Sequence, residues 1–142
     1  MTTNSQRASA RPTLDQRRAR HAWEAIQELL AKTASEADRK EYAGEAKKLP
    51  IRIINSGLGQ ALVFINAKAK DKKPTLKLLH QHLTDWTLKH RGLPGRRPNS
   101  LIESIIHGDS NFLRRATDEV LAYLQWLNRF AEAEGLTDVT AN

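Results

Sequence analysis

The sequence predicts an all-α fold: a single-domain, compact helical bundle of about six or seven helices. Three observations support this class. Apolar residues recur at intervals of three and four along most of the 142 residues. Helix-capping residues precede several of these runs, and no stretch alternates apolar and polar residues over a useful length. The connections are short, and the chain is long enough for one core, which together indicate a bundle.

Composition changes at both ends of the sequence. Residues 1–12 are small, polar and basic with no apolar period, so we expect a mobile basic arm there. Residues 13–136 form the predicted all-helical domain, and residues 137–142 form a frayed tail.

The first helix is expected to begin after Thr13, which with Gln16 forms a capping box, and to run to about Thr33. Three arginines, Arg17, Arg18 and Arg20, fall in its first turns, where the helix dipole disfavours cations. Their position suggests a reason outside the monomer. The residues expected to face inward are Ala19, Ala22, Trp23, Ile26, Leu29 and Leu30.

The central stretch from Lys47 to Lys68 holds the densest apolar run. Ser35 and Asp38 predict a helix that ends near Leu49, because proline is tolerated in a first turn but not inside a helix. Pro50 would then open a short helix to Ser56, Gly57 would stop it, and a third helix would cover 58–69. One buried face is predicted from the spacing of Ile51, Ile54, Leu58, Leu62 and Ile65.

Three further segments complete the expected bundle. Residues 75–90 predict an amphipathic helix that contains Trp86, and 91–99 predict a basic loop. Ser100 and Glu103 predict a short helix closed by Gly108. Asp109 or Ser110 caps the last helix, expected to reach about Glu134.

Charge is distributed unevenly. The net charge is +7, but residues 61–100 carry 9 basic and 2 acidic side chains, whereas residues 101–142 carry 3 and 7. A basic body with an acidic end indicates a polyanionic partner and head-to-tail contact between copies. The tryptophans fall on apolar faces, so we expect phosphate contact rather than base stacking. The candidate RNA-binding residues are Arg17, Arg18, Arg20, Lys47, Lys48, Arg52, Lys68 and Lys70.

Chemical motifs are scarce. With no cysteine, and with His80 and His82 on different faces of one helix, we expect no metal site; no cofactor motif occurs either. We expect no catalytic residue, although His82 near Asp85, or His107 near Asp109, would be the acid–base pairs of a small ribonuclease. No apolar run is long enough to span a membrane and no secretory signal occurs, which favours a cytoplasmic protein.

An alternative from another functional class uses residues 50–69. The spacing around Gly57 fits a helix-turn-helix, which would make the protein a DNA-binding regulator. Against this, the presumed recognition helix is almost wholly apolar and offers only Gln60 and Asn66 to base edges.

Three strings carry a resemblance to a known family: LDQRRARHAWEAI (14–26), YAGEAKKLPIRIINSGLGQALVFINAKA (42–69) and LRRATDEVLAYLQWLNRFAEAEGL (113–136). They resemble the small subunit of type III-B CRISPR effector complexes, the all-helical subunit of the Cmr (RAMP module) antiviral ribonucleoprotein. The resemblance covers nearly the whole chain, and its most specific part is the segment from Lys48 to Leu62.

The resemblance implies a non-catalytic scaffold. Copies of such a subunit stack beside the backbone subunits and line a channel that holds guide RNA and target RNA, while another subunit cleaves. The implied partners are therefore both RNAs, the other Cmr subunits and neighbouring copies of the chain, with no membrane. The cations that flank the shared core are Lys47, Lys48, Arg52 and Lys68.

Overall fold

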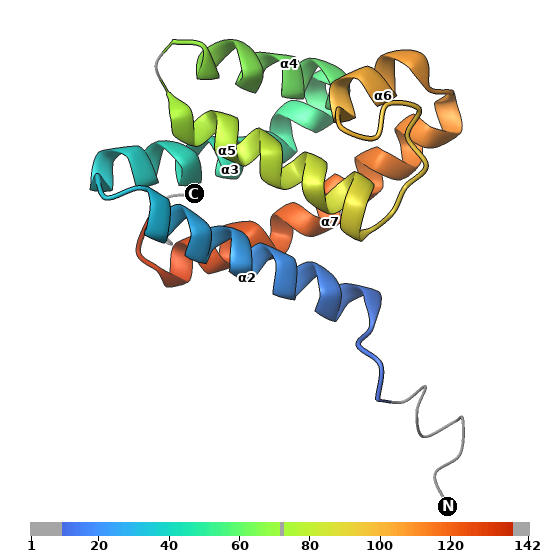
Figure 1. Ribbon diagram of the computed structural model, residues 1–142. Coiled ribbons are helices and arrows are strands. Elements are labelled where there is room, and N and C mark those ends of the chain that lie inside the picture. The colour runs from blue at the N-terminus through green and yellow to red at the C-terminus, as the bar shows by residue number, and fades with distance from the viewer. Residues whose placement is uncertain (1–9, 72, 138–142) are drawn as a thin grey trace, which may run out of the picture.

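The computed structural model describes residues 10–71 and 73–137, and within them the chain forms six α-helices and one π-helix with no strand (Figure 1). This confirms the all-α class. Positions 1–9 of the predicted arm and 138–142 of the predicted tail lie outside the described residues. The elements are α2 (Leu14–Lys32), α3 (Glu36–Ser56), α4 (Leu58–Ala69), α5 (Pro74–Thr84), the π-helix η1 (Asp85–His90), α6 (Leu101–His107) and α7 (Ser110–Ala133).

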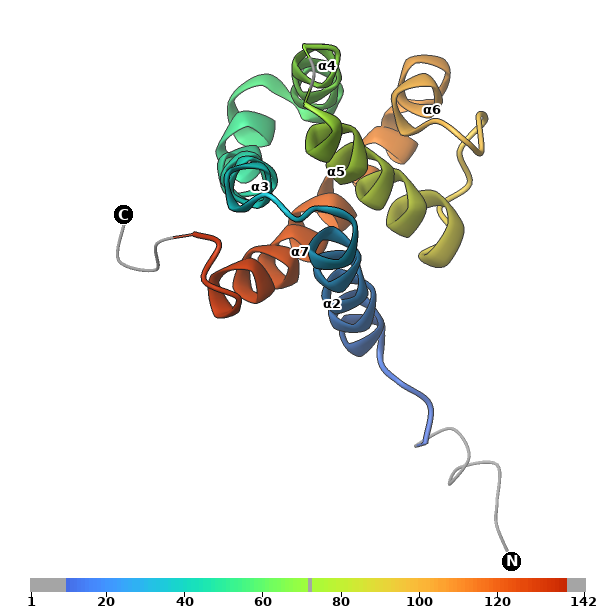
Figure 2. The ribbon, with the colours of Figure 1, turned by 60° about the vertical axis from the view of Figure 1, so that its left-hand side comes forward.

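The helices pack around one core. α2 lies along α7, and α3 packs against both α7 and α5 (Figures 1 and 2). α4 covers the other side of α3 and α5 and contacts α6. None of the described helices is long and apolar enough to cross a membrane. The largest fully buried side chains are Trp86, Tyr42, Tyr123, Ile26, Leu29, Leu49, Leu58, Leu62, Ile65, Leu76, Leu79 and Leu83.

The predicted helix starts are confirmed by their caps. The Thr13 hydroxyl accepts from the Gln16 N–H at 3.0 Å, and the Gln16 side chain accepts from the Thr13 N–H at 2.7 Å. Ser35, Ser100 and Asp109 each accept from the backbone N–H three residues on. Each cap satisfies an N–H that the first turn of its helix cannot.

The predicted helix break at Pro50 is wrong. α3 runs through Pro50 without interruption for 21 residues. Proline has no N–H to donate to the carbonyl four residues earlier, which is that of Ala46. The Asn128 side chain on α7 donates to that carbonyl instead, at 3.1 Å. A tertiary contact therefore replaces the hydrogen bond that the proline removes.

Continuity of α3 also changes which residues face the core. Ile53 is buried, four residues after the buried Leu49, whereas Ile51 and Ile54 are 57% and 69% exposed. The prediction that Ile51 and Ile54 share the buried face is therefore wrong. It is confirmed for Leu58, Leu62 and Ile65, which are fully buried: 0% of each is exposed.

Trp23 is a second correction to the predicted core. It is 51% exposed, whereas its neighbours Ala22, Ala25 and Ile26 are buried. Small alanines on that side of α2 allow a close approach to α7. The indole of Trp23 is too large for this close helix contact, so it lies on the surface.

Gly57 ends α3 as predicted. Its φ is +85°, a conformation that residues with a Cβ rarely adopt, and its N–H donates to the Ile53 carbonyl at 2.8 Å. α4 begins at the next residue and buries Leu58, Ala61, Leu62 and Ile65. Since these residues belong to the core, and the helix before Gly57 is the long α3, the helix-turn-helix alternative has no support.

The last turns of the predicted 75–90 helix form the π-helix η1 instead. The Arg91 N–H donates to the Trp86 carbonyl, five residues back, at 2.7 Å. η1 buries three consecutive residues, Trp86, Thr87 and Leu88.

The basic loop 91–99 is anchored to the fold. The Ser104 hydroxyl of α6 donates to the Arg97 carbonyl at 2.7 Å and accepts from the Arg97 N–H at 3.1 Å. A Cβ at Gly95 would lie 2.5 Å from the Ser104 Oγ and 2.9 Å from a methyl of Leu88. The loop therefore needs a glycine where it crosses α6.

Candidate nucleic-acid interface

The candidate cations fall into two groups. Arg17, Arg18 and Arg20 lie at the start of α2. The second group lies on α3 and α4 and consists of Lys47, Lys48, Arg52, Lys68 and Lys70, the last being the C-cap of α4. The two groups differ in what their side chains contact inside the fold.

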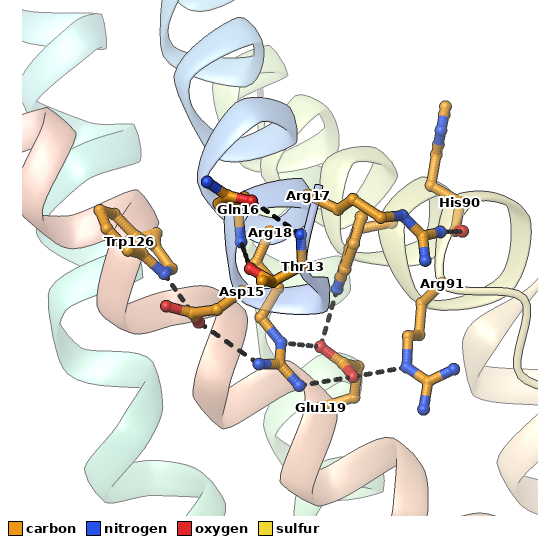
Figure 3. Close-up of polar contacts among 10 residues, drawn as sticks. Thr13, Asp15, Gln16, Arg17, Arg18, His90, Arg91, Glu119 and Trp126 are labelled. Atoms are coloured by element: carbon orange, nitrogen blue, oxygen red, sulfur yellow. Dashed lines mark hydrogen bonds and ion pairs between the residues drawn. The ribbon is translucent and has the colours of Figure 1, made fainter. Parts of the chain in front are cut away.

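Arg18 belongs to a network centred on a buried carboxylate of α7 (Figure 3). Its Nε and Nη2 donate to the two oxygens of Glu119 at 2.6 and 3.1 Å. Arg91 donates to the same carboxylate at 2.8 Å, and the Trp86 indole N–H at 3.1 Å. Burial alone would raise the pKa of Glu119, but hydrogen bonds from Arg18, Trp86 and Arg91 bring it below its ordinary value.

Arg17 also contacts the fold. Its Nη2 donates to the His90 carbonyl at 2.6 Å, and its guanidinium lies 6.0 Å from the centre of the Trp86 ring (Figure 3). Arg17 and Arg18 therefore have structural reasons to lie at the start of α2. Arg20 is different: its side chain is 81% exposed, and its Nε lies 3.4 Å from an oxygen of a surface carboxylate, Glu24.

A second buried carboxylate, Glu45 of α3, organises the other group. Arg52 donates to it at 2.6 Å and Lys68 of α4 at 2.5 Å. Burial would raise the pKa of Glu45, but hydrogen bonds from Lys68 and Arg52 lower it. Lys48 is exposed and lies three residues from Glu45 and four from Arg52, on the same side of α3. Two cations thus pair with a single negative charge, and a third, exposed cation lies on the same side of α3.

Sequence reasoning missed an aromatic residue in this group, Phe64. Its ring is partly exposed, with the Arg52 guanidinium 4.2 Å and the Lys68 ammonium 5.1 Å from its centre. The four-residue spacing of Phe64 and Lys68 on α4 was a signal that could have found it. We call Lys48, Arg52, Phe64 and Lys68 the α3–α4 basic patch. Lys47, next to Lys48 in the sequence, and Lys70, two residues after Lys68, are also exposed.

An apolar groove adjoins the basic patch and shares Phe64 with it. The groove has a volume of about 490 Å³ and lies between α4 and α6. Ile106 on its rim is 67% exposed, and Val63 is 51% exposed. An apolar surface of this kind on a small protein usually marks a contact with another protein. Its lining residues are Gly59, Gln60, Val63, Phe64, Ile102, Ile105 and Ile106.

Of the acid–base pairs considered for a ribonuclease, His82 with Asp85 is not assembled. His82 is buried and contacts the Tyr42 hydroxyl at 2.7 Å and Glu28 at 2.6 Å, not Asp85. Asp85 instead contacts His21 and His90. His107 is exposed at the last position of α6.

The fold and this surface define a small all-α protein in which a basic patch and an apolar groove lie side by side. A family model described as CRISPR-associated protein (Cas_Cmr5) matches residues 14–134. The chain belongs to this family of CRISPR-associated proteins, which confirms the resemblance identified from the sequence.

One curated relative and one solved structure support the assignment. The relative is the "CRISPR system Cmr subunit Cmr5" of Thermus thermophilus, 33% identical over 106 residues, which are 75% of this chain and 85% of the relative. The solved structure is the crystal structure of a CRISPR-associated Cmr5 family protein, also from Thermus thermophilus. It aligns with a TM-score of 0.66 and 32% identity, covering 86% of this chain and 97% of that one.

Proposed function

We propose that the chain is a non-catalytic, RNA-binding scaffold subunit of a type III-B CRISPR (Cmr) ribonucleoprotein in the cytoplasm. Several copies stack along the guide and target RNA and hold its backbone through a basic face. The relative named as a Cmr subunit supports membership of such a complex. The observation that carries the RNA-binding role is the α3–α4 basic patch.

The patch has the chemistry for a ribose-phosphate backbone. Lysine and arginine contact phosphate oxygens irrespective of sequence, which suits RNA whose sequence is read by base pairing. Phe64, which is exposed and lies near two cations, adds an aromatic surface for an unpaired base. Arg17 and Arg18 are not part of the α3–α4 basic patch, because they belong to the start of α2 and contact His90 and Glu119 there. Arg20 and Lys70 remain exposed candidates.

The adjoining groove suits a neighbouring protein subunit. It is almost wholly apolar, and an RNA backbone offers no apolar surface to fill it. RNA and protein contacts would therefore lie next to each other, meeting at Phe64. Such a layout fits a subunit that stacks with others along RNA.

A pull-down of the tagged chain from its native host separates the two contacts. The wild type is expected to recover other effector subunits together with guide-length RNA. Lys47→Glu with Lys48→Glu is expected to keep the protein partners and reduce the RNA, because each lost phosphate contact removes a unit of counterion release. Ile106→Glu is expected to lose protein partners, because it places a charge in the groove.

The matched control is Arg114→Glu with Arg115→Glu, another pair of consecutive exposed cations, on α7. It makes the same change in net charge on a different helix. Equal loss of RNA from both double variants would show that overall charge, not the α3–α4 patch, holds the RNA. Recovery of DNA or of no partner by the wild type would remove the proposed function altogether.

A further inference from the structure

A cluster of metal-ligating side chains lies at the junction of α2 and η1, away from the α3–α4 basic patch. His21 Nε2 is 2.8 Å from Asp85 Oδ2, and His90 Nε2 is 3.0 Å from the same oxygen. One ligand atom from each residue lies within 4.8 Å of the others. No sequence pattern pointed to this cluster, because its members are separated in the chain and none follows a familiar metal motif.

The π-helix is what brings two of the three ligands together. Asp85 and His90 are its first and last residues, five positions apart. In an α-helix of about 3.6 residues per turn, side chains five apart point in different directions. In a π-helix, hydrogen bonds join residues five apart, so these side chains lie one above the other. Single π turns of this kind are rare and occur often at functional sites.

The third ligand, His21, is fixed through its other ring nitrogen and through ring contacts. His21 Nδ1 is 2.6 Å from the Tyr123 hydroxyl, and the imidazole packs against the rings of Trp86 and Tyr123. Histidines that bind a metal through one nitrogen usually have the other fixed by a hydrogen bond, which sets the tautomer and the ring orientation. The His90 backbone is also fixed, since its carbonyl accepts from Arg17 at 2.6 Å.

The cluster is open on one side. The side chain of His21 is only 11% exposed, whereas those of Asp85 and His90 are 39% and 56% exposed. A cation could therefore reach the cluster from solvent and bind the largely buried His21 together with the more exposed Asp85 and His90. With both imidazoles neutral, the cluster carries one negative charge.

We propose that His21, Asp85 and His90 form a binding site for a divalent transition-metal ion. Two imidazole nitrogens and one carboxylate oxygen are a ligand set that suits Zn²⁺ and its neighbours, with water completing the coordination. A bound ion would replace the two histidine–aspartate hydrogen bonds and join α2 to η1, directly before the basic loop 91–99.

Zn²⁺ titration of the full-length, tag-free chain by isothermal calorimetry tests the site. We expect one Zn²⁺ per chain, and at least about tenfold weaker binding in His90→Ala and in Asp85→Asn. His107→Ala is the matched control, since it removes another exposed histidine at the end of a helix and should bind as the wild type does. Circular dichroism of each variant verifies that it is folded.

Nitrogen NMR of histidine-labelled protein supplies a second readout. Zn²⁺ should shift the Nε2 resonances of His21 and His90 and leave those of His107 unchanged. The proposal is overturned if the wild type takes up no Zn²⁺, if His90→Ala binds as the wild type does, or if His107→Ala loses as much affinity as His90→Ala. None of these results depends on whether the chain binds RNA.

Discussion

At the scale of single residues, the clearest outcome concerns buried carboxylates that no sequence pattern marked. Glu45 and Glu119 are each held by two cations, and in each pair at least one cation comes from another element. The arginines at the start of α2 looked unfavourable from the sequence because only the helix dipole could be considered there. Glu119 lies 101 residues from Arg18, so no local rule could pair them. The candidate cations engaged within the fold include Arg17, Arg18, Arg52 and Lys68.

Gly57 carries the first residue-scale prediction. Its positive φ of 85° is costly for a β-branched side chain, so Gly57→Val should lower the free energy of unfolding by about 1–3 kcal/mol. Gly44→Ala is the control, because Gly44 lies inside α3 with nothing within 4 Å of an added Cβ. It should raise stability by about 0.5–1 kcal/mol. Urea denaturation measures both, and an unchanged midpoint for Gly57→Val would refute the role of Gly57 as the helix stop.

At the scale of elements, the predicted helices were found except for the separate helix over 50–56, which is part of α3. The errors occur where a tertiary contact overrides a local rule. Helix starts depend on a cap within three residues, so Thr13, Ser35 and Ser100 could be recognised from the sequence. Pro50 could not be placed correctly, because its missing hydrogen bond is replaced from α7. The π-helix was equally out of reach, since the burial of Trp86, Thr87 and Leu88 together depends on the packed core.

The Pro50–Asn128 pairing gives the element-scale prediction. Asn128→Ala leaves the buried Ala46 carbonyl without a donor and should cost about 1 kcal/mol of unfolding free energy. In a Pro50→Ala background the restored N–H of residue 50 can donate to that carbonyl. The cost of Asn128→Ala should therefore shrink in the double variant. A double-mutant cycle by chemical denaturation measures this coupling, and strictly additive effects would show that Asn128 does not compensate for the proline.

At the scale of the whole molecule, the class of fold followed from periodicity, helix caps and short connections, whereas the arrangement of the surface did not. Exposure of Phe64 and Ile106 results from how α4 and α6 cross, so the basic patch and the apolar groove had to be seen in three dimensions. Charge composition did indicate a polyanionic partner. It could not separate cations that hold the fold together from those that remain exposed.

The pKa values of two histidines and of the two buried carboxylates, His80, His82, Glu45 and Glu119, are all lowered in the fold. Burial lowers the pKa of His82 and of His80, so the fold favours their neutral forms. In His82 this agrees with its contacts, since one nitrogen can donate to Glu28 while the other accepts from the Tyr42 hydroxyl. For Glu45 and Glu119, burial raises the pKa, but their hydrogen bonds to cations outweigh it and leave a lowered value.

A lowered pKa in the folded state means that the unfolded chain binds more protons, so the stability contributed by each group is present above its unfolded pKa and is lost on acidification. The free energy of unfolding should therefore fall in two stages as pH decreases: below about pH 6.5 as histidines are protonated, and below about pH 4.5 as carboxylates are. Urea denaturation between about pH 3 and pH 7.5 measures the profile. His82→Gln should flatten the upper stage, whereas His107→Gln, at an exposed position, should leave it unchanged. A wild-type profile that is level between about pH 5 and pH 7 would show that the buried histidines are as easily protonated in the fold as in the unfolded chain.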